Sequence, residues 1–147
     1  MKKILLCVML FWSCQNVMAQ VADGSSLGFV RLNHLALQVK DIPASRDFYR
    51  DVVGLKPVEV PDSLKAIRAW FDTGDGQMIH LLAGRNFEVV NDRNGGHFAM
   101  FVSSIAGAEK FLLSKKIKFH KQVRFDGVTQ IYFADPDGYL IELNQKK

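Results

Sequence analysis

The sequence predicts an α+β fold built from two paired copies of one βαβββ module. The first observation is an internal repeat, in which Asn33–Val39 matches Gly96–Val102 at a displacement of 63 residues. The second is that each copy reads, in order, as one strand, one helix and three strands. Self-similarity of this kind indicates one supersecondary unit used twice. We therefore expect a single domain at residues 29–145, with modules at 29–84 and 95–145.

The length and composition are those of an ordinary globular domain. The chain has 147 residues, of which 48% are hydrophobic and 23% charged, so one domain with its own core is expected. The net charge is +4, but Lys and Arg are spread along the whole chain. That distribution gives little support to nucleic-acid binding, and we expect a small-molecule partner instead.

The first nineteen residues are typical of a secretory signal peptide. Lys2 and Lys3 precede an apolar run from Ile4 to Trp12, and a cleavage site follows Ala19. The run is shorter than the roughly 20 residues that a membrane-spanning helix needs. Residues 1–19 therefore predict export, to a periplasm or to the outside of the cell.

Both cysteines of the chain, Cys7 and Cys14, fall in this leader. The exported protein would then have neither a disulfide framework nor a thiolate metal site. Lipid attachment at Cys14 is the alternative, although the bulky Phe11 and Trp12 before it make a poor processing site.

Local signals place the elements of each module. Asp41 with Pro43, and Ser104 in the second copy, are typical of helix starts. The first helix is expected to run to about Val53 and to stop at Gly54. Its inward stripe is expected at positions spaced by four, Ala44, Phe48 and Val52.

Turn and loop signals complete each module. Residues 73–76 and 135–138 carry hairpin-turn residues between strand-like runs. The polar stretch 85–94 marks the connection between the copies.

Strand alternation predicts where the polar side chains point. In the first and last strands of each copy, apolar residues alternate with polar ones and face the helix. The opposite face then carries His34, His80, His97 and Glu142.

These four residues predict a metal site. His34 is the repeat equivalent of His97, and His80 that of Glu142. A lone strand histidine usually makes an ordinary hydrogen bond, but equivalent placement of all four favours metal ligation. Imidazole and carboxylate ligands suit Zn, Ni, Fe, Co or Mn. His120 has no repeat partner, and we expect it to be a structural or pocket-edge residue.

The same alternation predicts the substrate-binding residues. If Phe71 and Phe133 pack under the helices, the metal-side face carries Arg68, Trp70, Gln130 and Tyr132. Arg68 is suited to an anionic group and Trp70 to a planar or apolar one. The alternative is that the aromatic side chains only pack and Arg68 is solvated.

Several of these motifs together resemble the vicinal oxygen chelate superfamily. They are Asn33-His34, Gly96-His97 and the closing run from Asp135-Pro136-Asp137-Gly138 to Ile141-Glu142-Leu143. The superfamily contains glyoxalase I, methylmalonyl-CoA epimerase, extradiol dioxygenases and fosfomycin- and bleomycin-resistance proteins. The resemblance implies the glyoxalase/bleomycin resistance/dihydroxybiphenyl dioxygenase fold, with eight strands around a cleft that contains a divalent ion.

The resemblance also implies a function. It points to an exported, divalent-metal-dependent, glyoxalase-like enzyme of the lyase or isomerase type. Such an enzyme chelates a small substrate through vicinal oxygens, and Glu142 is the ligand able to act as its base. His80 stands where glyoxalase I and the epimerase more usually have Glu or Gln.

Two other functions stay open. His34, His97 and Glu142 form a two-histidine, one-carboxylate set that suits an extradiol-type dioxygenase. A non-catalytic protein of the bleomycin-resistance kind would use the same hollow to bind a small molecule. The sequence also leaves open whether the modules of one chain pair with each other or with those of a second chain in a homodimer.

Overall fold

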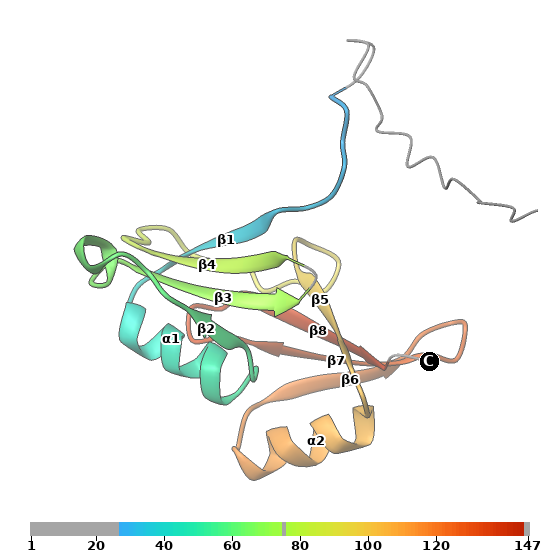
Figure 1. The fold of residues 1–147 in the computed structure, drawn as a ribbon. Helices are drawn as coiled ribbons and strands as arrows, with labels where there is room; N and C mark the ends of the chain where they lie inside the picture. Colours follow the sequence, from blue (N-terminus) through green and yellow to red (C-terminus); the bar gives the residue numbers. More distant parts are fainter. Residues whose placement is uncertain (1–26, 75, 146–147) are drawn as a thin grey trace, which may run out of the picture. The chain divides into compact units, whose positions relative to one another are not determined.

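Figure 1 shows a computed structural model of the chain, which describes residues 27–74 and 76–145. The predicted signal peptide and the alternative lipid site at Cys14 lie outside the described residues. The chain divides into two units after Arg31. Residues 27–31, the described part of the first unit, contain no helix or strand. All the elements described below belong to the second unit, which begins at Leu32.

The first module forms one four-stranded sheet with one α-helix. Its elements are β1 (His34–Val39), α1 (Ile42–Asp51), β2 (Lys56–Val58), the short 3-10 helix η1 (Asp62–Leu64), β3 (Arg68–Gly74) and β4 (Gln77–Ala83). The strands lie in the order β1-β4-β3-β2.

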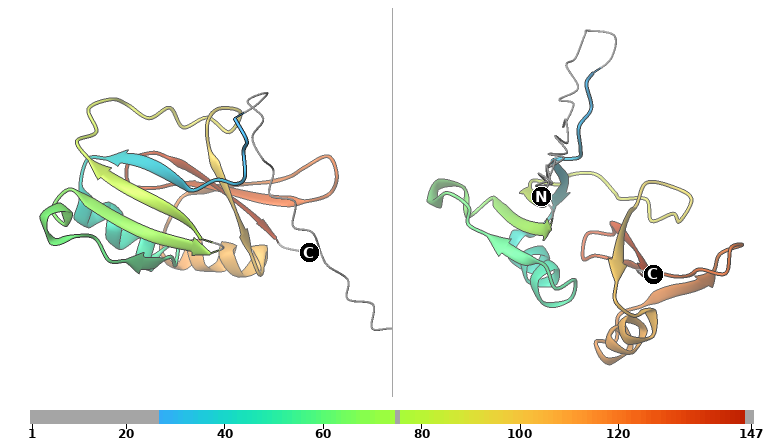
Figure 2. Two further views of the ribbon diagram at one scale, coloured as in Figure 1. Left: turned by 45° about the horizontal axis from the view of Figure 1, so that its top comes forward. Right: turned by 45° about the vertical axis from the view of Figure 1, so that its right-hand side comes forward.

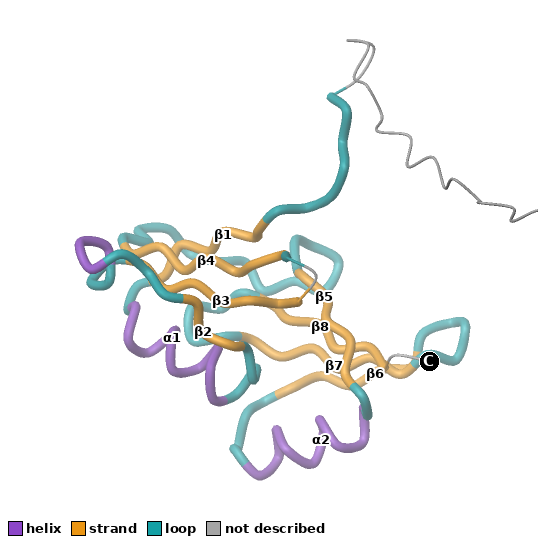
Figure 3. Tube along the Cα trace, in the orientation of Figure 1, coloured by secondary structure: helices purple, strands orange, loops and turns teal. Residues whose placement is uncertain are grey.

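The second module repeats this plan. Its elements are β5 (Phe98–Val102), α2 (Ile105–Ser114), β6 (Phe119–Val123), β7 (Thr129–Ala134) and β8 (Leu140–Gln145), with strands in the order β5-β8-β7-β6. Figure 3 shows the two βαβββ units joined by a loop, and residues 84–97 contain no helix or strand. The predicted fold is confirmed.

The first and last strands of each module are parallel neighbours. In the first sheet Ala36 lies opposite His80, and in the second Ala99 lies opposite Glu142. This pairing brings side chains of the first and last strands of a module together on one face of its sheet. It is the geometry that the predicted ligand pairs require.

The helices begin where the sequence predicts. The Asp41 side chain accepts a hydrogen bond from the backbone N–H of Ala44, and Ser104 accepts one from that of Gly107. Beyond α1, Gly54 has a φ of +82°, a left-handed conformation that favours glycine. In the described parts of the chain, neither helix is long and apolar enough to span a membrane.

The predicted inward stripe of α1 is confirmed at Phe48 and Val52, which pack against the core, and is wrong at Ala44. Ala44 is exposed, and the buried residues of the helix are Ile42, Ser45 and Tyr49. The reason is that polar atoms of Ser45 and Tyr49 have hydrogen-bond partners in the second module, so burying them costs little. A hydrophobicity pattern does not detect buried polar residues.

One hydrophobic core spans both modules. It contains the inward residues of the strands, such as Leu37, Phe71 and Ile141, as strand alternation predicts. Phe48 of α1 lies against Phe133 of β7, with ring centroids 6.2 Å apart. Because the core covers one face of each sheet, the opposite face is available for the predicted site.

The turn between β7 and β8 docks onto the first module, and we call Asp135–Gly138 the docking turn. Asp137 accepts hydrogen bonds from the backbone N–H of Lys40 at 2.8 Å, the Ser45 hydroxyl at 2.8 Å and the Arg85 guanidinium at 3.0 Å. Asp135 accepts one from the Tyr49 hydroxyl at 2.9 Å. Both carboxylates are buried. Figure 2 gives two further views of the modules that this turn connects.

Candidate metal and substrate site

The first pair of predicted ligands lies on the β1–β4 sheet. The imidazole rings of His34 and His80 stack with centroids 4.3 Å apart. Trp70 of β3 stacks on His80 at 5.0 Å. Burial, and then the nearby His34, lower the pKa of His80, which favours the neutral ring that binds metals.

One atom of this pair has no partner. Among the described residues, His80 Nε2 is the buried side-chain nitrogen or oxygen that lacks a hydrogen bond. A buried polar atom without a partner is costly. Its presence on the predicted metal face fits a ligand supplied from outside the chain.

The second pair lies on the β5–β8 sheet. Nε2 of His97 is 2.9 Å from Oε2 of Glu142. His97 Nδ1 lies 3.0 Å from the carbonyl oxygen of Gly95, which can only accept, so Nδ1 carries a proton. In a neutral ring Nε2 is then an acceptor that faces another acceptor. A proton or a cation has to lie between them, and a metal ion would satisfy both.

Polar neighbours hold the Glu142 carboxylate. Oε1 accepts hydrogen bonds from the side-chain amides of Gln130 and of Asn144, the latter at 2.6 Å. Burial works to raise the pKa of Glu142, but hydrogen bonds from Asn144, Tyr132 and His97 outweigh it and hold the pKa below its ordinary value. Glu142 is therefore an anion, which is the form in which a carboxylate binds a metal.

Imidazole and carboxylate groups are suitable ligands for a divalent transition-metal ion. Here they occur as two pairs. Within residues 27–74 and 76–145, no group of three or more His, Cys, Asp or Glu side chains is close enough to hold a metal. Each sheet brings together two of the four predicted ligands. Their assignment as ligands stays a prediction.

The predicted substrate-binding residues lie on the same faces. Trp70 stacks on His80, and Tyr132 lies edge-on to His97 with centroids 5.7 Å apart. Arg68 lines a hollow of about 240 Å³ beside β2 and β3, and its guanidinium donates to the carbonyl of Ile67. Figures 1 and 3 show the strands that carry these residues.

Gln130 is buried and hydrogen-bonded within the protein. It is 3% exposed, and its Nε2 group donates to Glu142 Oε1 and to Asn144 Oδ1. Its two N–H donors are therefore used inside the protein. A role of Gln130 toward substrate stays a prediction, while its contact with Glu142 is what the structure describes.

Sequence reasoning missed three residues of this face. Asn144 lies two positions after Glu142 on the same face of β8, so strand alternation could have found it. Gln122 lies on β6, where the same argument applies. Arg93 belongs to the connecting loop, and nothing in its sequence context indicated that its guanidinium would reach Gln122 and His120.

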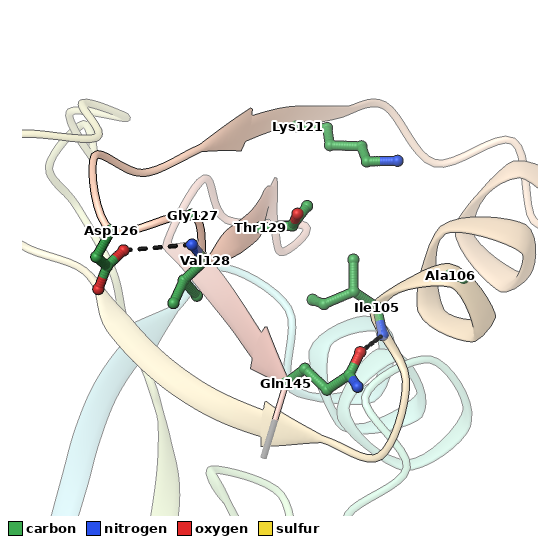
Figure 4. Close-up of a pocket in the computed structure, with 8 residues that line it drawn as sticks. All are labelled: Ile105, Ala106, Lys121, Asp126, Gly127, Val128, Thr129 and Gln145. Atoms are coloured by element: carbon green, nitrogen blue, oxygen red, sulfur yellow. Dashed lines mark hydrogen bonds between the residues drawn. The ribbon is translucent and has the colours of Figure 1, made fainter. Parts of the chain in front are cut away.

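A second hollow, of about 460 Å³, lies near the start of α2 (Figure 4). Ile105, Lys121, Thr129 and Gln145 are among its lining residues. None of the predicted ligand or substrate residues lines it. It is separate from the site described above.

Comparison with known proteins decides the family. Residues 31–143 match the model of the Glyoxalase/Bleomycin resistance protein/Dioxygenase superfamily. The chain belongs to this superfamily. Its ligand-like residues thus occur in a fold whose members include metal enzymes and binding proteins, and fold alone does not select among them.

Two curated relatives and one solved structure make the likeness more specific. The chain is 31% identical over 129 residues to Glyoxylase I 4 of Arabidopsis thaliana, covering 82% of this chain and 73% of the relative. It is 28% identical over 153 residues to a lactoylglutathione lyase of Schizosaccharomyces pombe, covering 84% of this chain and 50% of that protein. A glyoxalase/dioxygenase from Nostoc punctiforme has a similar structure, with a TM-score of 0.66 and 26% identity over 80% of this chain and 91% of that one. The enzymes that this chain resembles are of the glyoxalase type.

Proposed function

We propose that this protein is a divalent-metal-dependent, glyoxalase-type lyase or isomerase that acts on a small substrate bearing neighbouring oxygens. The observation that supports it most directly is the His97–Glu142 pair, in which Nε2 and Oε2 lie 2.9 Å apart and need a shared cation or proton. The likeness to a lactoylglutathione lyase and a glyoxylase I supports the reaction class.

The proposed metal ligands are His34, His80, His97 and Glu142. The chemistry that a bound Zn, Ni, Fe, Co or Mn ion would supply is polarisation of a substrate carbonyl. Glu142 would accept and return the substrate proton, because it is the only one of the four that is a carboxylate and it is ionised at neutral pH. Trp70 and Tyr132 would flank the substrate and exclude water.

We further propose that a complete site forms between two copies of the chain. Support comes from the separation of the ligands into two pairs on two sheets. His34 begins β1 and His97 directly precedes β5, and β1 and β5 are edge strands of their sheets. An edge strand has backbone groups free to face a second chain. Export by the leader at residues 1–19 is also part of the proposal.

Metal analysis tests the central claim. The purified protein should hold a stoichiometric transition metal, and His34→Ala and Glu142→Ala should each lose most of it. His120→Ala is the matched control, since it removes a histidine outside the proposed ligand set and should keep the metal. A protein that takes up no metal on careful reconstitution would overturn the proposal in favour of a metal-free binding protein.

Mixing two inactive variants tests the two-chain site. One variant carries His34→Ala with His80→Ala, and the other His97→Ala with Glu142→Ala. If each site uses one pair from each chain, mixed dimers hold one intact site, and metal binding and lyase activity return. If all four ligands come from one chain, no mixture recovers either property.

The substrate class is tested with the metal-loaded protein. A hemithioacetal of glutathione and methylglyoxal should turn over, with the product followed in the ultraviolet. Turnover of a catechol with uptake of oxygen, and none of the hemithioacetal, would show the extradiol-type dioxygenase instead.

A further inference from the structure

A line of side-chain hydrogen bonds crosses the second sheet and ends on Glu142. The guanidinium of Arg93 donates to Gln122 Oε1 at 2.8 Å. Gln122 Nε2 donates to Gln130 Oε1 at 3.1 Å. Gln130 Nε2 donates in turn to Glu142 Oε1. The line runs from the connecting loop through β6 and β7 to β8, and we call Arg93, Gln122 and Gln130 the relay.

The two ends of the relay fix the orientation of both amides. A guanidinium can only donate and a carboxylate can only accept. Gln122 therefore has to turn its oxygen to Arg93, and Gln130 has to turn its nitrogen to Glu142. The two central groups then meet nitrogen to oxygen, which is the pairing observed at 3.1 Å. All three bonds point the same way, from the cation to the anion, so they polarise one another.

The relay also limits which oxygen of Glu142 is available to another ligand. Oε1 is occupied by Gln130 and by Asn144 at 2.6 Å. Oε2 is the oxygen that faces His97 at 2.9 Å. Gln130 is 3% exposed, so water does not compete freely for its amide. Only one oxygen of the Glu142 carboxylate, Oε2, is therefore directed at His97.

We infer that Arg93, Gln122 and Gln130 are positioning residues that hold Glu142 with a single oxygen directed at the metal. The inference rests on the proposed role of Glu142 as a ligand. Partners that orient a metal ligand typically change metal affinity by about 10–100-fold when they are mutated. Among the described residues, the side chain of Gln122 hydrogen-bonds to Arg93 and Gln130, and not to Glu142 or His97. An effect of that size from Gln122 therefore has to pass through Gln130.

Gln122→Glu tests the direction of the relay with almost no change of shape. A glutamate at this position still accepts from Arg93 but cannot donate to Gln130. Gln130 would then turn its nitrogen toward residue 122 and its oxygen toward Glu142, which would lose a donor. We expect Gln122→Glu to weaken Co²⁺ binding by about 10-fold or more, and Gln122→Met by less.

Simple electrostatics gives the opposite result, which makes the test decisive. An added negative charge near a cation site strengthens cation binding, so charge alone would make Gln122→Glu bind Co²⁺ more tightly than Gln122→Met. Val123→Glu is the matched control, because it adds the same charge at the next position on the other face of β6. It should leave Co²⁺ affinity unchanged or slightly stronger. Co²⁺ binding by Gln122→Glu as tight as that of Val123→Glu would overturn the inference.

A second measurement separates this inference from the proposed function. In the metal-free protein, the side-chain ¹⁵NH₂ resonances of Gln130 report its hydrogen bonds directly. They should move in Gln122→Glu and in Arg93→Ala, and stay in place in Val123→Glu. If the protein binds no metal but these resonances move, the proposed function fails while the relay stands. Unchanged Gln130 resonances in Gln122→Glu would refute the relay itself.

Discussion

Arg85 and Asp137 form an ion pair inside the protein, with Nε 3.0 Å from Oδ1 and both side chains 3% exposed. Arg85 follows the last strand of the first module, and Asp137 belongs to the docking turn of the second. The pair therefore joins the two modules at a place that is largely shielded from solvent.

Arg85→Ala should be strongly destabilising. It leaves the buried Asp137 carboxylate without its cation, and breaking a buried pair in this way costs about 3–5 kcal/mol in free energy of unfolding. Urea unfolding followed by circular dichroism measures the change. Arg124→Ala is the control, because it breaks an exposed pair with Asp126 and should leave the unfolding midpoint close to that of the parent. Equal midpoints for the two variants would show that the Arg85 pair is hydrated.

Asp135 should make stability depend on pH. Burial raises the pKa of this carboxyl above its ordinary value of 3.8, and hydrogen bonds from Tyr49 and from backbone N–H groups only partly oppose it. The folded state then holds the proton more tightly than the unfolded chain does. Its contribution to stability is complete below pH 3.8 and is lost as pH rises through the folded-state pKa.

Asp135→Asn isolates this contribution, since the amide does not titrate. The free energy of unfolding of the parent, minus that of Asp135→Asn, should fall as pH rises above 3.8, the ordinary pKa of the carboxyl. Urea unfolding at several pH values gives the difference. A difference that grows with pH would mean that the pKa of Asp135 is lowered in the folded protein.

Phe71→Ala should remove much of the stability of the first sheet. Phe71 is completely buried, and truncation of a buried phenylalanine costs about 3–5 kcal/mol. Phe125→Ala is a matched control, because Phe125 is 99% exposed and its loss should change the free energy of unfolding by less than about 0.5 kcal/mol. Thermal or urea unfolding compares them. Similar losses would indicate that Phe125 is covered in solution.

Trp70 should report on metal binding through His80, on which it stacks at 5.0 Å. In a Trp12→Phe background, Trp70 is the only tryptophan of the chain. Addition of Co²⁺ should quench its fluorescence with a saturable dependence, and His80→Ala should abolish the saturable part. Quenching that survives in His80→Ala would place the ion elsewhere.

Much of the fold could be predicted because the sequence is repeated. The match of Asn33–Val39 with Gly96–Val102 predicted two modules, and alternation predicted that apolar residues of the first and last strands, such as Leu37 and Ile141, face the core. Strand alternation follows from backbone periodicity. Once one face of a strand is buried, a shift of one residue would move its whole apolar set to the solvent face. The pairing of β1 with β4 is given by the structure.

The buried polar contacts could not be predicted in this way. Ser45 and Tyr49 are inward only because Asp137 and Asp135 arrive from residues about 90 positions later in the sequence. Likewise, Gln130 was expected to face substrate, and its bonds to Glu142 depend on the side-chain geometry of three strands. Local pattern carries no information about such partners, which are set by tertiary structure.

The docking turn makes the first half of the protein depend on the second. Asp135 and Asp137 belong to the second half, whereas the groups that donate to them, Tyr49, Ser45 and Arg85, belong to the first half or directly follow it. A fragment that ends after Arg85 would therefore lack both carboxylates, and Arg85 would lose the anion with which it pairs.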